Sequence, residues 1–122
     1  MDFNWNKYGN RKYHAKSWNC WSLVCAFYKD HFGIELTEYE DDESIVPQAF
    51  IMEAENWRRV IYPDPGDVIT FKIYGRPWHC GLIINSSEMF HLLKGCEVVV
   101  ESFQIPMWRN RIDKFYKHTD RI

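Results

Sequence analysis

The 122-residue chain lacks a strong charge of either sign and lacks any long hydrophobic run. Its formal net charge is −2, and acidic and basic residues are interspersed apart from a short acidic stretch at residues 38–43, so we expect no nucleic-acid partner. No apolar stretch approaches the roughly 18 residues needed to cross a bilayer, and residues 1–10 lack the apolar centre of a signal peptide. We therefore expect no membrane association, and synthesis in a cytoplasm.

The cysteines do not form a Cys-x-x-Cys pair or the dense framework of a small disulfide-linked fold. They are Cys20, Cys25, Cys80 and Cys96. We expect reduced thiols. A zinc site could draw on these cysteines together with His79 and His91, but His79 and Cys80 are adjacent and would point to opposite faces of a strand. We therefore expect no metal and no cofactor.

The sequence is rich in large rings. Hydrophobic residues make up 46% of the chain and aromatic residues 17%, which predicts a core filled by aromatic side chains rather than a disordered chain. The length fits one domain, residues 1–122, and no internal repeat or linker interrupts it.

The order of periodic segments predicts an α+β domain. Helical patterns cover residues 20–32 and 44–60, and strand patterns cover residues 68–74, 78–84, 89–93 and 97–103. Residues 1–18 read as a loop packed by its rings, and residues 107–122 as a short helix and an edge strand. We expect the first helix to pack on an antiparallel sheet.

Cys20 opens the first predicted helix. Asn19 is a good N-cap residue, apolar residues recur at three- and four-residue spacings after Cys20, and Gly33 ends the pattern. A thiol at a helix N-terminus lies beside unpaired backbone N–H groups and the positive end of the helix dipole, which lower its pKa. Cys20 is therefore the candidate nucleophile, although a small buried core cysteine would fit the same position.

Two histidines could supply the base that this thiol needs. We predict a three-residue loop at residues 85–87, which pairs Ile84 with Glu88. This register places His79 opposite Leu93 and diagonal to His91. Diagonal neighbours on one face lie about 7–8 Å apart at Cα, so one imidazole could orient the other. A slip of one residue would separate them.

Four motifs together carry a family resemblance. They are Asn-Cys-Trp-Ser-Leu-Val at 19–24, Gly-Asp-Val-Ile-Thr-Phe at 66–71, His-Cys-Gly-Leu-Ile-Ile at 79–84 and Phe-His at 90–91. In order and spacing they resemble the NlpC family of papain-like cell-wall cysteine peptidases. The tryptophan directly after the cysteine and Trp-Arg-Asn-Arg at 108–111 resemble the phage tail-assembly and tail-tip branch of that family. The resemblance covers nearly the whole chain.

This resemblance implies a papain-like fold and a role for each candidate residue. Cys20 would be the nucleophile, His79 the general base and His91 the residue that orients it. The family also places a tyrosine upstream of the nucleophile, near the oxyanion, which suggests Tyr8 with Tyr13 as the alternative. The double glycine that follows this tyrosine in the family is a single glycine here, and the Cys20 backbone N–H is a further candidate donor. Cys25, Cys80 and Cys96 are expected to be dispensable.

The implied activity is hydrolysis of an amide bond in peptidoglycan stem peptides, between D-γ-glutamyl and a diamino acid. In a phage tail tip, alongside other tail-tip proteins of the virion, this activity would open the cell wall during genome delivery. An alternative is a structural tail-tip component that uses the peptidase fold as an interaction module. A third possibility is acyl transfer or amide hydrolysis on another substrate, because the same chemistry serves many acyl groups.

Overall fold

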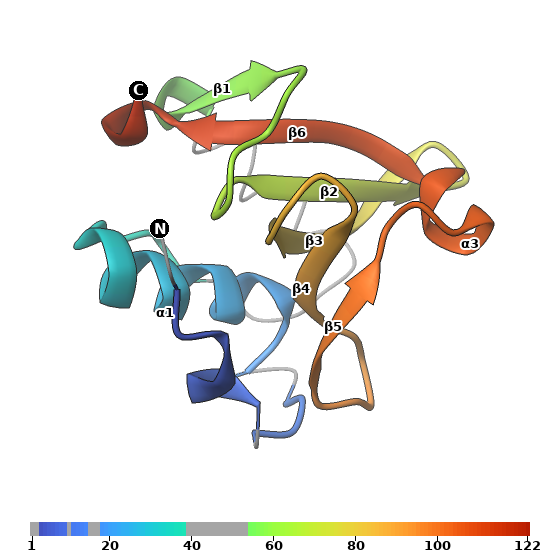
Figure 1. Cartoon of the computed structure of the whole chain (residues 1–122), viewed down its shortest axis with the longest axis horizontal. Coiled ribbons are helices and arrows are strands. Elements are labelled where there is room, and N and C mark those ends of the chain that lie inside the picture. The colour runs from blue at the N-terminus through green and yellow to red at the C-terminus, as the bar shows by residue number, and fades with distance from the viewer. Residues whose placement is uncertain (1–2, 10, 15–17, 39–53) are drawn as a thin grey trace.

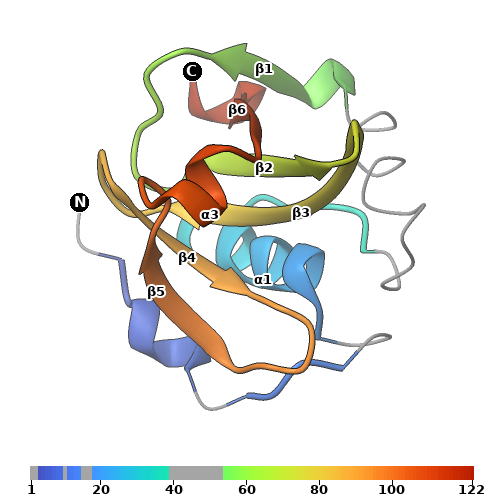
Figure 2. The ribbon, with the colours of Figure 1, turned by 90° about the vertical axis from the view of Figure 1, so that its right-hand side faces the viewer.

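The computed structural model describes residues 3–9, 11–14, 18–38 and 54–122. Helix α1 (Cys20–Phe32) packs against a six-stranded sheet, as Figure 1 and Figure 2 show. In sheet order the strands are β1 (Trp57–Val60), β6 (Ile112–His118), β2 (Val68–Ile73), β3 (Arg76–Ile83), β4 (Glu88–Leu92) and β5 (Val98–Ser102). Each neighbouring pair is antiparallel. The predicted α+β class, with the first helix on an antiparallel sheet, is confirmed.

Helix α1 begins and ends where its capping residues predict. The Asn19 side chain accepts a hydrogen bond from the Ser22 backbone N–H at 2.9 Å, which satisfies one of the donors that a helix leaves free at its start. Gly33 ends the helix in the left-handed conformation at φ 65°, and its N–H donates to the Lys29 carbonyl. Capping at both ends fixes which residue opens the helix, and that residue is Cys20.

The central strands are buried on both faces. On one face of β3 and β4, side chains such as Leu82 and Phe90 pack with α1 in one hydrophobic cluster. The opposite face carries Ile83 and Met89, which pack with Trp108 in a second cluster. Trp108 comes from α3 (Pro106–Arg109), the short helix before β6. Polar side chains on this second face are therefore shielded from water.

The N-terminal segment packs through its rings, as its composition predicts. It contains the 3-10 helix η1 (Trp5–Tyr8). The Trp5 ring stacks on Phe27 of α1 with centroids 4.8 Å apart, and Phe3 meets Phe27 edge-on at 5.0 Å. Trp5 also lies 5.1 Å from the ring of Phe90 on β4, so the N-terminal rings pack against the core between α1 and the sheet.

Two predictions about the ends of the sheet are wrong for one shared reason. Residues 54–60 were predicted to continue a helix, but they form the 3-10 helix η2 (Ala54–Asn56) and strand β1; residues 44–53 of that predicted helix lie outside the described part of the chain. Strand β1 pairs with β6, so Trp57 lies opposite His118 and packs on its ring at 5.0 Å. Pairing with a distant segment overrides the local helical pattern. Because β1 takes the edge, β6 is an interior strand and not the predicted edge strand.

The start of β2 is tied to the C-terminal end of the chain by a buried carboxylate. Asp67 is fully buried, and its Oδ1 accepts hydrogen bonds from the Arg121 guanidinium and from Lys117 Nζ, the latter at 3.1 Å. The Asp64 backbone N–H also donates to Asp67, at 2.7 Å. The Gly-Asp motif therefore has a structural explanation, because a buried carboxylate is stable only when it is paired. The last 3-10 helix, η3 (Thr119–Arg121), supplies the arginine.

Candidate active site

Cys20 is the first residue of α1 and is 6% exposed. Helix α1 contacts both β3 and β4. These two strands pair directly only at Leu82–Phe90 and Ile83–Met89, and they diverge beyond. The N-terminal end of α1, blue in Figure 2, lies behind the diverging strands. The thiol is thereby held against the part of the sheet that carries the two histidines.

The surroundings of Cys20 hold the pKa of its thiol well below the ordinary value. The largest cause is a hydrogen bond between the Cys20 and Cys80 side chains, and burial opposes it by disfavouring the charged form. A hydrogen bond and the charge of His79 lower the pKa further, as does the Cys80 backbone. Cys80 thus contacts the candidate nucleophile, whereas the sequence predicted only that it would be dispensable.

The predicted hairpin register brings His79 and His91 into direct contact. Ile84 N–H donates to the Glu88 carbonyl at 2.9 Å, as the three-residue loop requires. His79 Nε2 and His91 Nδ1 lie 2.8 Å apart, and both side chains are buried. A Cβ atom on Gly81 would lie only 3.0 Å from the His91 Cβ. Glycine at this position therefore makes room for the second histidine.

Glu101 extends this pair and was missed by the sequence reasoning. It lies on β5, and its Oε2 is 2.7 Å from His91 Nε2. In the β4–β5 register His91 lies opposite Val99, so Glu101 is its diagonal neighbour on the same face. The strand register that predicted the contact between the histidines could also have been extended from β4 to β5. It would then have predicted that Glu101 lies beside His91.

Trp108 covers the histidine pair from the second face of the sheet. Its indole centroid lies 5.8 Å from the His79 ring and 5.1 Å from the His91 ring. Trp78 stacks on the outer side of Trp108 at 6.0 Å. The shielding has an electrostatic effect on His91: burial, together with the charge of His79, lowers its pKa to about 4, although Glu101 acts in the opposite direction. His91 is therefore neutral near neutral pH.

The carboxylate of Glu101 is ionised in this setting. Burial alone raises its pKa, but Trp108 and the hydrogen bond with His91 lower it below the ordinary value. The Trp108 indole N–H faces the carboxylate without meeting the geometry of a hydrogen bond. An ionised carboxylate can only accept a hydrogen bond, so the proton in this contact belongs to His91.

The structure does not bring the Tyr8 hydroxyl to this site. It donates to Asp30 Oδ2 at 2.7 Å, and burial and then Asp30 raise the pKa of Tyr8. Asp30 lies in the last turn of α1, which puts it about 15 Å along the helix axis from Cys20. The Tyr13 hydroxyl is buried and has no hydrogen-bond partner within the described residues. Tyr13 N–H donates to the Cys96 carbonyl, which fixes Tyr13 beside the β4–β5 turn.

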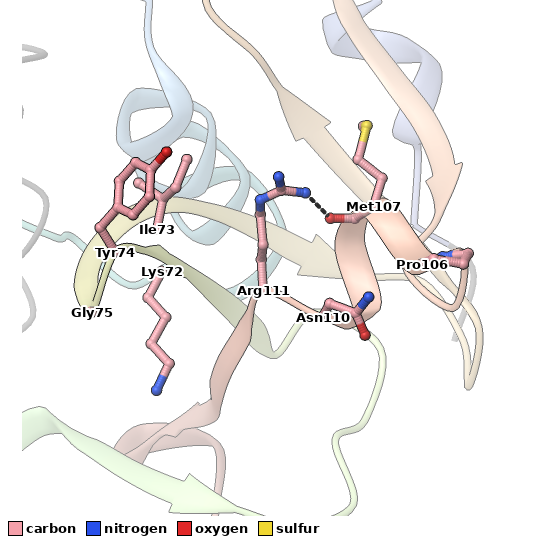
Figure 3. A pocket seen from close by; sticks show the side chains of 8 residues that line it. All are labelled: Lys72, Ile73, Tyr74, Gly75, Pro106, Met107, Asn110 and Arg111. Carbon is pink, nitrogen blue, oxygen red and sulfur yellow. Dashed lines mark hydrogen bonds between the residues drawn. The ribbon is translucent and has the colours of Figure 1, made fainter.

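A pocket of about 590 Å³ lies between the β2–β3 turn and α3. Figure 3 shows Tyr74 on one side of it and Met107 on the other, with Arg111 between them and Lys72 pointing away below Tyr74. Arg111 donates to the Met107 carbonyl, which holds its guanidinium at the pocket. In Figure 1 the blue end of α1 points toward the side of the molecule that carries α3. The pocket and the thiol end of the helix therefore share one side of the fold.

Two features are absent from the described residues: a metal-binding cluster and a membrane-spanning helix. Across residues 3–9, 11–14, 18–38 and 54–122, no group of three or more histidine, cysteine, aspartate or glutamate side chains is arranged to hold a metal ion. In the same part of the chain no helix is long and apolar enough to cross a membrane.

The sequence model of the NlpC/P60 family matches residues 3–117. The chain therefore belongs to the NlpC/P60 family, whose members are generally cysteine peptidases and peptidoglycan hydrolases. The predicted family resemblance is confirmed.

Individual proteins are similar to this chain in sequence or in structure. The chain is 25% identical over 116 residues to tail tip assembly protein K of Escherichia phage N15; the match covers 84% of this chain and 45% of that protein, so the chain spans less than half the length of this relative. Among solved structures, the NlpC/p60 domain of the peptidoglycan hydrolase SagA superposes with a TM-score of 0.66 at 18% identity, covering 93% of this chain and 92% of that one. A lipoprotein-like NLP/P60 protein of Staphylococcus aureus gives 0.67 at 17% identity, over 93% and 38%. These structures share the fold.

Proposed function

We propose that the chain is a cysteine peptidase that hydrolyses an amide bond in peptidoglycan stem peptides, of the D-γ-glutamyl–diamino acid type. The observation that carries the proposal is the lowered pKa of the Cys20 thiol at the start of α1, next to His79. A thiolate of this kind is the nucleophile of acyl-transfer chemistry. Membership of the NlpC/P60 family supports the peptidoglycan substrate.

In the proposed reaction the Cys20 thiolate attacks the amide carbonyl carbon and forms a carbon–sulfur bond. The Cys20 backbone N–H, at the helix N-terminus, donates to the developing oxyanion. His79, protonated at this stage, gives its proton to the leaving amine nitrogen as the carbon–nitrogen bond breaks. Water then attacks the thioester, His79 removes its proton, and the thiolate leaves.

The test of this proposal is incubation of the purified protein with defined muropeptides, with products identified by mass spectrometry. We expect cleavage that is lost in Cys20→Ala and in His79→Ala. Cys96→Ala is the matched control, because Cys96 is an exposed free cysteine and its removal should leave turnover intact. Absence of cleavage on every stem-peptide type, in a protein that is folded, would contradict the proposal.

The cationic pocket beside α3 supports an orientation for this substrate. A γ-linked glutamyl residue keeps its α-carboxylate free, and guanidinium groups bind carboxylates well. Lys72 faces Asp113 at 3.7 Å, which offsets its charge, so we assign carboxylate binding to Arg111. We expect Arg111→Gln to raise KM with little change in kcat. The matched control is Arg109→Gln, which removes an exposed arginine of α3 that does not line the pocket.

The similarity to a tail tip assembly protein supports a place in a phage tail tip, where the hydrolase would act with other tail proteins during genome delivery. The same similarity favours a second candidate, a structural tail-tip component that uses the peptidase fold for interaction. Phage that carry Cys20→Ala separate the two. Particles that assemble normally but lose infectivity support catalysis, whereas unchanged infectivity supports the structural role.

A further inference from the structure

Glu101 sits at the end of a chain of hydrogen-bonded side chains that leads to the thiol. We propose that Glu101 is a positioning residue, which holds His91 in its Nε2–H form and through His91 fixes the ring of His79. The proposal rests on the proposed peptidase function, because it assigns Glu101 a part in the same reaction. It extends the expected set of Cys20, His79 and His91 by a fourth side chain.

The direction of each hydrogen bond follows from the carboxylate. Glu101 Oε2 lies 2.7 Å from His91 Nε2, and an ionised carboxylate only accepts, so His91 Nε2 carries the proton. A neutral imidazole has one donor and one acceptor nitrogen. His91 Nδ1 is then the acceptor, and it lies 2.8 Å from His79 Nε2, which must be the donor.

The consequence reaches the nitrogen that serves the thiol. Because the Nε2–H of His79 donates to His91, only Nδ1 of His79 is left to exchange a proton with Cys20. In the opposite, Nδ1–H form of His91, His79 could keep the 2.8 Å contact only by accepting at Nε2, which moves its own proton to Nδ1 and leaves no bare nitrogen to take a proton from Cys20. Glu101 thus selects the one arrangement in which His79 is both anchored and able to accept a proton.

The environment of the contact shows that it is more than a surface ion pair. His91 has a side-chain exposure of 1%, against 32% for Glu101, and its pKa of about 4 keeps it neutral near neutral pH. The contact is therefore a hydrogen bond from a neutral imidazole to a carboxylate. Because Trp108 packs on the His91 ring at 5.1 Å, water does not readily take the place of Glu101 on the covered side.

Kinetics of Glu101 variants test the role. We expect Glu101→Ala to lower kcat about 10- to 100-fold, the size typical of losing a group that orients a functional histidine, with KM nearly unchanged. Glu101→Gln should retain more activity than Glu101→Ala, since its amide oxygen still accepts from Nε2–H. It should not reach the parent rate, because the amide can also turn and donate to the wrong form of His91. Glu97→Gln, an exposed glutamate just before β5, is the matched control.

A spectroscopic measurement separates this proposal from the peptidase proposal. Nitrogen-15 NMR of the histidine rings distinguishes a protonated from a bare ring nitrogen without any substrate. We expect His91 to be Nε2–H in the parent protein and to become a mixture of forms in Glu101→Ala. This result would stand even if no muropeptide were cleaved. A parent protein without the Nε2–H form, or a Glu101→Ala protein that keeps both that form and its kcat, would overturn the positioning role.

Two controls test whether Glu101→Ala misfolds. They are the isosteric Glu101→Gln protein and thermal unfolding of both variants. A purely structural role predicts that kcat falls only in proportion to the folded fraction. The positioning role predicts a lower kcat in protein that is fully folded by circular dichroism. A proportional loss in both variants would overturn it.

Discussion

Buried, neutral His91 should make the protein lose stability in mild acid. Its pKa is about 4 in the folded protein, against an ordinary 6.5. Above pH 6.5 the histidine is neutral in both folded and unfolded chains and contributes no pH dependence. Between pH 6.5 and about 4, His91 binds a proton in the unfolded chain but not in the folded protein. The free energy of unfolding therefore falls as the pH falls.

The size of this loss follows from the width of the window. Each pH unit between the two pKa values removes about 1.4 kcal/mol, which gives a total of about 3 kcal/mol for the pKa of about 4. The loss then levels off below that pKa, where both states are protonated. For comparison, a domain of this size has a total stability of about 5–15 kcal/mol. The histidine alone can therefore remove a large share of it.

The assay is urea unfolding at several pH values from about 7 to about 4, on the parent protein and on His91→Gln, which cannot take up a proton. The parent should lose about 3 kcal/mol more than the variant across this range. Other titrating groups change both proteins, and the difference isolates His91. Parallel curves for the two proteins would refute the reasoning, since they would mean that His91 protonates normally in the folded state.

Three further predictions concern the thiol, the histidine pair and the buried carboxylate. Cys80→Ala should raise the pKa of Cys20, measured as iodoacetamide alkylation rate against pH with peptide mapping, whereas Cys80→Ser should preserve more of the shift because a hydroxyl still donates. Gly81→Ala should lower kcat roughly tenfold by displacing His91, and it should also lower the free energy of unfolding by about 1–3 kcal/mol, the usual cost of overpacking a buried site; an unchanged kcat would contradict the tight contact. Asp67→Ala should cost about 3 kcal/mol in urea unfolding by removing the buried carboxylate that pairs with Arg121, while Lys117 keeps its ion pair with Asp64, and a loss below about 1 kcal/mol would show that water replaces the carboxylate.

The sequence by itself determined the parts of the site that depend on local rules. Asn19 and Gly33 cap α1 through contacts within one turn, so the position of Cys20 at the helix start could be read from the pattern. The His79–His91 contact followed from the length of one hairpin loop, because loop length fixes the register of the two strands it joins. The alternation of side chains then placed both rings on one face.

Only the tertiary structure decided the contacts between segments far apart in the chain. Strand β1 forms because it pairs with β6, where Trp57 packs on His118. The local sequence pattern does not indicate a partner so far away in the chain. The Tyr8 hydroxyl bonds Asp30, at the far end of α1 from the thiol, because the N-terminal rings pack along that helix. Cys80 meets Cys20 only when β3 is laid against α1. Such contacts depend on how layers pack and on side-chain shape, and neither propensity nor periodicity encodes those directly.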